Sequence, residues 1–144
     1  PKPVQQPVPV IVGGGGPRRT PALAARYAAE FNAGFGSPEK VAEQYARVGR
    51  ACEEIGRDPG SLVLSLAHTT VVGTDEAQFR RRAQAIGRDP QELREGALGG
   101  TVTELVDRLG SYREAGVERV YLQVMDLSDL DMLDLLAREV VTQL

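Results

Sequence analysis

Short apolar runs alternate along the chain with longer stretches in which apolar residues recur every three or four positions. The short runs are typical of buried β-strands, and the longer stretches are typical of amphipathic helices. Strands are predicted at residues 10–12, 31–33, 62–72 and 117–124. Because helical stretches separate these strands, the pattern predicts an α/β fold in which parallel strands alternate with helices.

Proline, serine and glycine mark the bounds of the first two predicted helices. Pro17 suits the first turn of one helix, and Ser37 with Pro38 opens a long helix that ends at Gly56. We expect the first helix to bury Leu23, Ala24, Tyr27 and Ala28, and the second to bury Val41, Tyr45, Val48, Cys52 and Ile55.

A third helix is predicted to open at residues 74–76 and to carry three consecutive arginines: Arg80, Arg81 and Arg82. Such a run suggests a nucleic-acid surface, but neighbouring helical positions point about 100° apart. We therefore expect the three arginines to form a solvated face that pairs with nearby acids. The pentad Ile-Gly-Arg-Asp-Pro occurs at residues 55–59 and again at 86–90, and we expect both copies only to end helices.

Two polar clusters near the carboxyl end are predicted to cap helices. Thr101 and Glu104 have the spacing of a capping box. The aspartate cluster resembles a metal site but lacks the glycine and terminal glutamate of a calcium loop, so capping of the last helix explains it better; its members are Asp126, Asp129 and Asp131. We predict no metal site in the chain.

The first strand runs through four glycines directly into the first helix. These glycines and the start of the helix are Gly13, Gly14, Gly15, Gly16, Arg18, Arg19 and Thr20. Glycine lets an anion approach main-chain N–H groups, and the amino end of a helix carries a positive dipole. The corner suits a phosphate group, although a strand-to-helix turn that simply needs room fits the glycines equally well.

Neither standard glycine motif matches this corner. A P-loop would need Gly-Lys followed by Ser or Thr, where the chain has Gly-Pro-Arg-Arg-Thr. A dinucleotide motif beginning at Gly13 meets Arg18 in place of its third glycine. Nucleoside triphosphates are therefore not the favoured ligand.

Three further residues are candidates for a functional site. Asn32 lies in the second strand and Phe35 in the Gly-Phe-Gly that ends it; both are candidate substrate-pocket residues, and a hinge with an apolar plug is the alternative. His68 is the single histidine, and we expect a structural role because it lacks nearby partners for a metal site or a triad.

Composition narrows the class of protein without naming a function. The chain has 144 residues, 42% hydrophobic and 26% charged, with a net charge of -3, which favours a small-molecule ligand over nucleic acid. No apolar run reaches the roughly 18 residues of a membrane span, and no signal-peptide pattern opens the sequence, so we expect no membrane partner and a cytoplasmic location. With Cys52 as its single cysteine, the chain needs a bound cofactor for any redox chemistry.

Several stretches occur together in the order typical of one family. The chain opens with PKPVQQPVPVIVGGGGPRRTPALAARYA, continues through a Gly-Arg-Asp-Pro turn at residues 56–59 and a Gly-Thr helix start at residues 100–101, and then has Ala-Gly-Val-Glu-Arg-Val at 115–120 before an aspartate-rich tail. These motifs resemble the C-terminal half of the luciferase-like monooxygenase family, in its coenzyme F-420-dependent branch.

The resemblance implies a (β/α)8 barrel that binds FMN or coenzyme F-420, with the cofactor phosphate at residues 13–20. A complete barrel needs about 250 residues, so we expect residues 1–144 to form a partial barrel whose earlier strands are absent. The catalytic residues are not assigned, since the family places most of them on those earlier strands. We expect the chain alone to be inactive.

Two functions remain open at this point. One is the C-terminal part of a flavin- or F-420-dependent oxidoreductase or monooxygenase acting on a small molecule. The other is a non-catalytic half-barrel that serves as an assembly or binding module. In both cases we expect exposed strand edges to pair with the missing half-barrel or with a second copy, giving a dimer or larger oligomer.

Overall fold

A computed structural model describes residues 2–144 of the chain. These residues form two compact units. The first comprises the described residues up to Ala67 together with Ala115–Val120, and the second comprises His68–Glu114 and Tyr121–Leu144. The α/β prediction is confirmed, because parallel strands alternate with helices along the chain.

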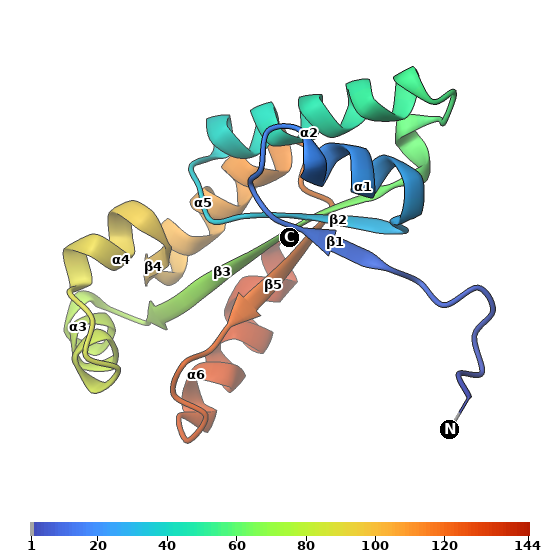
Figure 1. The fold of residues 1–144 in the computed structure, drawn as a ribbon. Helices are drawn as coiled ribbons and strands as arrows, with labels where there is room; N and C mark the ends of the chain where they lie inside the picture. The colour runs from blue at the N-terminus through green and yellow to red at the C-terminus, as the bar shows by residue number, and fades with distance from the viewer. Residues whose placement is uncertain (1) are drawn as a thin grey trace. The chain divides into compact units, whose positions relative to one another are not determined.

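The first unit is built on parallel strands with helices against them (Figure 1). Its elements are β1 (Ile11–Gly13), α1 (Arg19–Tyr27), β2 (Glu30–Ala33), α2 (Pro38–Glu54), a 3-10 turn (Pro59–Ser61) and the first part of β3 (Val63–Gly73). Ile11 pairs with Glu30, and Glu30 pairs in turn with Val63. Because all three strands are parallel, the loops that follow β1 and β2 lie at the same edge of the sheet.

The core of the first unit lies between these strands and helices α1 and α2. Its most buried side chains include Ala24, Phe31, Val41, Val48, Cys52 and Leu66. Three residues that we expected in the core are exposed instead: Leu23 at 49%, Tyr27 at 63% and Ile55 at 49%. The buried stripe of α1 consists of the small residues Pro21, Ala24 and Ala25, so its larger side chains point away. Ile55 lies beyond the last turn of α2.

Arg57, in the first Gly-Arg-Asp-Pro turn, closes the carboxyl end of α1. Its guanidinium donates to the carbonyl oxygens of Ala25 at 3.0 Å and Ala28 at 2.8 Å. These carbonyls have no partner within the helix, so a cation there satisfies them. The turn does more than end a helix, which is the only role that the sequence pattern predicts.

The second unit contains the later parts of β3 and of β5 (Arg119–Gln123), the short strand β4 and the helices from α3 to the carboxyl end. In chain order these elements are α3 (Glu76–Ala85), α4 (Pro90–Gly96), β4 (Leu98–Thr101), α5 (Val102–Glu114) and α6 (Leu130–Leu135), followed by a π turn (Leu136–Val140) and a 3-10 turn (Val141–Gln143). Thr70 of β3 pairs in parallel with Leu98 of β4. The last helix begins at Leu130 and does not continue to the carboxyl end as one regular α-helix.

Strand β4 was not predicted, because Leu-Gly-Gly-Thr lacks the β-branched run that marks most strands. The first three residues of this strand are buried. A Cβ at Gly99 would lie 2.8 Å from the backbone carbonyl of Leu93, which is closer than real side chains approach. Glycine is required there because α4 lies directly against the strand.

Strand β5 (Arg119–Gln123) pairs with β3. Its side chains alternate between half-buried and exposed, as the sequence pattern predicts: Val120 and Leu122 are half-buried, and Tyr121 and Gln123 are exposed. At the start of this segment, the Glu118 N–H donates to the carbonyl oxygen of Leu64 at 2.8 Å.

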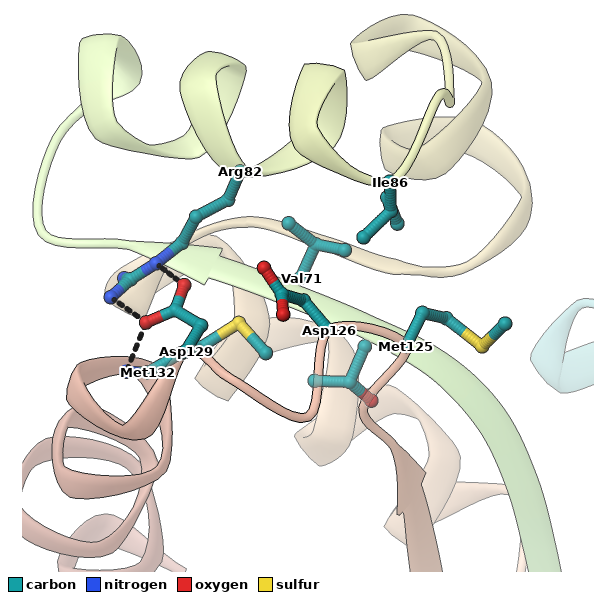
Figure 2. Close-up of a pocket in the computed structure, with 8 residues that line it drawn as sticks. Val71, Arg82, Ile86, Met125, Asp126, Asp129 and Met132 are labelled. Atoms are coloured by element: carbon teal, nitrogen blue, oxygen red, sulfur yellow. Dashed lines mark hydrogen bonds and ion pairs between the residues drawn. The ribbon is translucent and has the colours of Figure 1, made fainter.

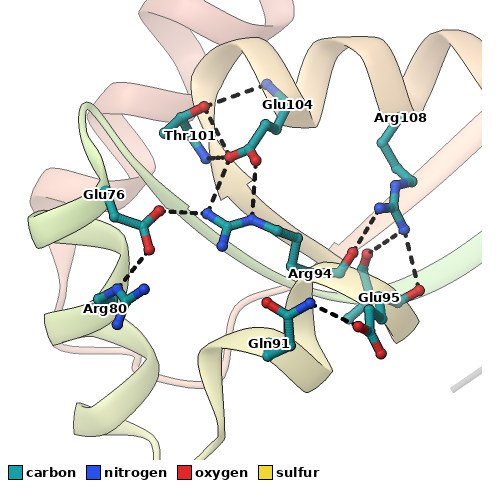
Figure 3. A network of polar contacts seen from close by, with 9 residues as sticks. Glu76, Arg80, Gln91, Arg94, Glu95, Thr101, Glu104 and Arg108 are labelled. Carbon is teal, nitrogen blue, oxygen red and sulfur yellow. Dashed lines mark hydrogen bonds and ion pairs between the residues drawn. The ribbon is translucent and has the colours of Figure 1, made fainter.

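A polar network joins three elements of the second unit (Figure 3). The Arg94 guanidinium pairs with Glu76 at 2.5 Å and with Glu104 at 3.0 Å. The Glu104 carboxylate accepts from the Thr101 N–H at 2.7 Å, which confirms the predicted capping box. Arg80 pairs with Glu76 at 2.5 Å, as expected for a solvated arginine beside an acid. No helix in residues 2–144 is both long and apolar enough to span a membrane.

Candidate functional site

The glycine corner joins the end of β1 to the start of α1. Gly14 takes a φ of +129°, which L-residues with side chains rarely adopt, so the turn depends on glycine at this position. Arg18 is the N-cap residue of α1, and its side chain makes no capping hydrogen bond. The first turn of α1 holds no acidic residue. The positive end of this helix is therefore not neutralised by a side chain of its own.

The loop after β2 lies beside the glycine corner. The Gly14 N–H donates to the carbonyl oxygen of Asn32 at 3.4 Å. A Cβ at Gly34 would lie 3.9 Å from the backbone nitrogen of Gly15. The two loops therefore share one edge of the sheet, where the carboxyl ends of parallel strands form ligand sites in α/β proteins.

Space around the corner differs sharply from one glycine to the next. A Cβ at Gly16 would lie 2.9 Å from the Thr20 hydroxyl, so this hydroxyl lies over the turn. A Cβ at Gly15 would meet no atom within 4 Å. The backbone at Gly15 is thus open to an approaching group, with the Thr20 hydroxyl close to the neighbouring residue.

The two predicted arginines are exposed at this corner. Within the described chain, the side chains of Arg18 and Arg19 make no hydrogen bond or ion pair with other residues. Arg18 also lines a groove between α1 and α2. The structure therefore brings together the glycines, Thr20 and the start of α1. Arg18 lies both at this corner and in the groove between α1 and α2.

Asn32 and Phe35 occupy different environments. Asn32 is half-buried, and its amide donates to the Ser65 hydroxyl at 2.9 Å. Ser65 is in turn held by the Tyr45 hydroxyl, which donates to its carbonyl oxygen at 2.8 Å. Phe35 is 64% exposed. Asn32 is thus fixed at the sheet edge beside the corner, whereas Phe35 lies on the surface.

The ionisable groups behind this edge are structural. Burial, followed by the charges of Glu118 and Glu30, raises the pKa of the Tyr45 hydroxyl above its ordinary range. Tyr45 therefore stays protonated and acts as a hydrogen-bond donor. Glu30 is buried and paired with Arg119. Neither group is placed to exchange a proton with a ligand at the glycine corner.

His68 is buried in the second unit, where its ring centroid lies 6.2 Å from that of Tyr112. Burial, and then the charge of Arg108, lowers the pKa of His68 below its ordinary value. The imidazole is therefore neutral at physiological pH. This environment agrees with the structural role expected for the residue.

A cluster of polar and apolar side chains surrounds a small cavity in the second unit (Figure 2). Its volume is about 10 Å³, and its lining residues are Thr70, Val71, Arg82, Ile86, Met125, Asp126, Asp129 and Met132. This volume suffices for about one water molecule. The cavity is too small to hold an organic ligand.

Arg82 corrects one prediction, since it is not part of a solvated face. Its side chain is 10% exposed and pairs with Asp129 through two bonds of 2.6 and 3.1 Å (Figure 2). It also donates to the carbonyl oxygen of Val72 at 2.8 Å. Local spacing could not show this contact, because Asp129 lies 47 residues away in the sequence.

One of the three clustered aspartates, Asp129, has the predicted capping function. Asp129 accepts from the Met132 N–H at 2.9 Å at the start of α6. Asp126 accepts from the Ser128 N–H at 2.9 Å and from its hydroxyl at 2.6 Å. Across residues 2–144, no group of three histidine, cysteine or acidic side chains is placed to hold a metal ion.

Comparison with known families decides the membership of the chain. The model of the luciferase-like monooxygenase family matches residues 1–93, which is more than half of the chain. The chain belongs to the luciferase-like monooxygenase family. The resemblance seen in the sequence motifs is confirmed by this match. A search of curated proteins found no match.

Solved structures of luciferase-like enzymes share the fold. A coenzyme F-420-dependent tetrahydromethanopterin reductase from Methanopyrus kandleri is 14% identical with a TM-score of 0.73, over 94% of this chain and 50% of the reductase. An F-420-dependent secondary alcohol dehydrogenase, solved with an F-420-acetone adduct, is 18% identical with a TM-score of 0.79, over 99% of this chain and 50% of the dehydrogenase.

A flavin enzyme shares the same fold. The oxygenating constituent of 3,6-diketocamphane monooxygenase from Pseudomonas putida, solved with FMN, is 16% identical with a TM-score of 0.70, over 94% of this chain and 49% of the enzyme. These neighbours are (β/α)8 barrels, so the fold prediction is confirmed. The luciferase-like chain spans about half the length of each of these proteins.

Proposed function

We propose that this luciferase-like chain is the C-terminal part of a flavin- or F-420-dependent oxidoreductase or monooxygenase, and that the glycine corner holds the cofactor phosphate. The observation that carries the proposal is the uncapped amino end of α1. Its N-cap side chain makes no capping bond, its first turn holds no acid, and the preceding backbone at Gly15 faces open space. An anion at this position would satisfy the free N–H groups and the helix dipole together.

Each residue of the corner has a separate proposed role. The backbone N–H groups of the glycine turn and of the first helical residues donate to the phosphate oxygens. The Thr20 hydroxyl, which lies over Gly16, adds a side-chain donor. Arg19, which is exposed and without an ion pair in the described chain, adds a charged donor for a phosphate oxygen.

Bound at this corner, FMN or coenzyme F-420 supplies the hydride-transfer chemistry. The contribution of the chain is to fix the phosphate end, which orients the rest of the molecule. Asn32 lies beside the corner with its amide held by Ser65, and we propose that it contacts the substrate or cofactor from the loop side. Phe35, exposed on the loop that follows, is a second proposed contact.

The chain spans about half of its structural neighbours, so we propose that the remaining barrel strands complete the site and carry the proton-transfer groups. The 144-residue chain alone would then lack turnover. A cytoplasmic location remains a prediction.

A substitution at Gly15 tests the proposal. In the full-length protein that carries this chain, Gly15→Val places a side chain in open space, so it should obstruct an anion without disturbing the fold. We expect the Kd for FMN or F-420 to rise at least tenfold, which corresponds to a loss of about 1.4 kcal/mol of binding free energy. The control is Gly110→Val in α5, where an added Cβ also meets no atom within 4 Å. Fluorescence titration that finds equal affinity for both variants would refute the phosphate site.

A further inference from the structure

A groove on the surface of the first unit runs between the start of α1 and the second half of α2. Its volume is about 260 Å³. The residues that line it are Pro17, Arg18, Pro21, Ala22, Arg47, Arg50, Ala51 and Glu54. Four of these are small or cyclic apolar residues, and three are arginines. The lining of the groove therefore combines apolar residues with basic side chains.

The positive charge of the groove is only partly compensated. Arg47 and Arg50 are three residues apart on α2, so their side chains lie on the same face of the helix. Arg47 pairs with Glu43 at 3.1 Å. Within residues 2–144, the side chains of Arg18 and Arg50 make no hydrogen bond or ion pair, and Glu54 is the single acid that lines the groove. Like charges at this spacing destabilise a helix unless an anion lies between them.

The size of the groove limits what it can bind. Pockets for whole organic ligands run from about 300 to 1,000 Å³. A single phosphate or diphosphate group fits this space, and guanidinium groups match its oxygens in geometry and charge.

We propose that this groove is a second anion site, which binds the phosphate or diphosphate group of a small molecule through Arg47 and Arg50, with Arg18 at its edge. The groove differs from the glycine corner, because it shares only Arg18 with the corner and none of the four glycines lines it. The proposal goes beyond the cofactor role of the corner and does not depend on it. Arg50 is the main ligand, since its guanidinium has no partner in the described structure.

Two neutralising substitutions on α2 should change the affinity for diphosphate in opposite directions. In the full-length protein, calorimetric titration with inorganic diphosphate should show at least tenfold weaker binding for Arg50→Gln. Glu54→Gln should bind about threefold more tightly, because it removes the acid of the groove. The control is Arg81→Gln, which removes an equally exposed and unpaired arginine from α3, and it should leave the affinity unchanged.

Four outcomes decide the matter. Loss in Arg50→Gln, gain in Glu54→Gln and no change in Arg81→Gln support the groove. Equal loss in Arg50→Gln and Arg81→Gln means general charge attraction, and it overturns the proposal. Binding that Gly15→Val abolishes and Arg50→Gln leaves intact belongs to the corner; this result overturns the groove and leaves the cofactor role standing. In the fourth outcome, diphosphate still binds in an Arg50-dependent way and Gly15→Val leaves the cofactor affinity unchanged. This result supports the groove and refutes the phosphate site at the corner.

Discussion

Single arginines in this chain hold contacts between segments that are distant in the sequence. Arg57 reaches the carbonyl oxygens of α1 about thirty residues earlier, at 3.0 and 2.8 Å. Arg82 reaches Asp129 and the carbonyl oxygen of Val72. Such contacts join charged donors to acceptors that are shielded from water, where hydrogen bonds contribute most to stability. Away from the glycine corner, Arg57 and Arg82 are therefore the residues at which substitutions should lower stability most.

Arg57 and Arg88 occupy the same position in the two copies of the pentad, which makes them a matched pair. Arg57→Ala leaves the last carbonyls of α1 without their donor and should lower the free energy of unfolding by about 1.5 to 3 kcal/mol. The Arg88 side chain makes no hydrogen bond or ion pair in the described chain, so Arg88→Ala should change the free energy of unfolding by no more than about 0.5 kcal/mol. Urea unfolding of the full-length variants measures both; equal effects would contradict this role of Arg57.

The Arg82–Asp129 pair should make stability depend on acid pH. The hydrogen bond from Arg82 is the largest of the effects that hold the pKa of Asp129 below its ordinary 3.8. The unfolded chain therefore binds this proton more tightly, so the stabilisation is present above about pH 4 and is lost as pH falls through the folded pKa. Asp129→Asn should cost about 3 kcal/mol at neutral pH and flatten the acid limb of the stability curve.

The control for this prediction is an ion pair on the protein surface. Asp134 pairs with Arg138 at 3.5 Å, and its side chain is 72% exposed. Asp134→Asn should change stability by no more than about 0.5 kcal/mol and leave the acid limb unaltered. Unfolding measured from neutral pH down to about pH 3 would contradict the interpretation if both variants gave the same curve.

At the scale of elements, periodicity was sufficient for most strands and helices but not for β4 or for the buried face of α1. Strand β4 depends on tight contact with Leu93, and a Leu-Gly-Gly-Thr segment carries no local sign of it. Tyr27 and Leu23 have helical spacing with Ala24, yet the packing selects the small side chains as the buried stripe. Local pattern gives the type of an element, whereas the choice of packed face depends on its neighbours.

The same limit applied to the candidate site. The glycine run and the helix that follows were visible in the sequence, because both are local. The proximity of Asn32 and Gly34 to the corner depends on parallel pairing of β1 with β2, which no local pattern specifies. The basic groove between α1 and α2 was missed for the same reason, although arginines three apart on α2 were a signal that could have drawn attention.

Two glycine-to-alanine substitutions test the packing of β4. Gly99→Ala would force a Cβ to within 2.8 Å of the Leu93 backbone and should cost about 1 to 3 kcal/mol. Gly110→Ala, inside α5 and with open space around its Cβ, should stabilise by about 0.5 to 1 kcal/mol. Thermal unfolding of both variants should give shifts of opposite sign. A Gly99→Ala variant as stable as the parent would show that β4 does not need the close approach.

At the scale of the whole molecule, the chain spans about half of each barrel with which it was compared. Apolar side chains just before and at the start of β1 are exposed, including Val8, Val10 and Ile11. An exposed apolar edge of a parallel sheet favours association with another strand. We expect the isolated 144-residue chain to form dimers or larger species. Light scattering that finds a soluble monomer at micromolar concentration would contradict this expectation.

The most direct measurement compares FMN with riboflavin, which lacks the phosphate, in the full-length protein and in its Gly15→Val and Gly110→Val variants. Matched titrations isolate the contribution of the phosphate from that of the ring. The phosphate site predicts that the parent and Gly110→Val bind FMN at least tenfold more tightly than riboflavin, a difference of about 1.4 kcal/mol. It also predicts that Gly15→Val removes this preference while leaving riboflavin affinity unchanged. A Gly15→Val variant that keeps the full preference for FMN would show that the phosphate is held elsewhere.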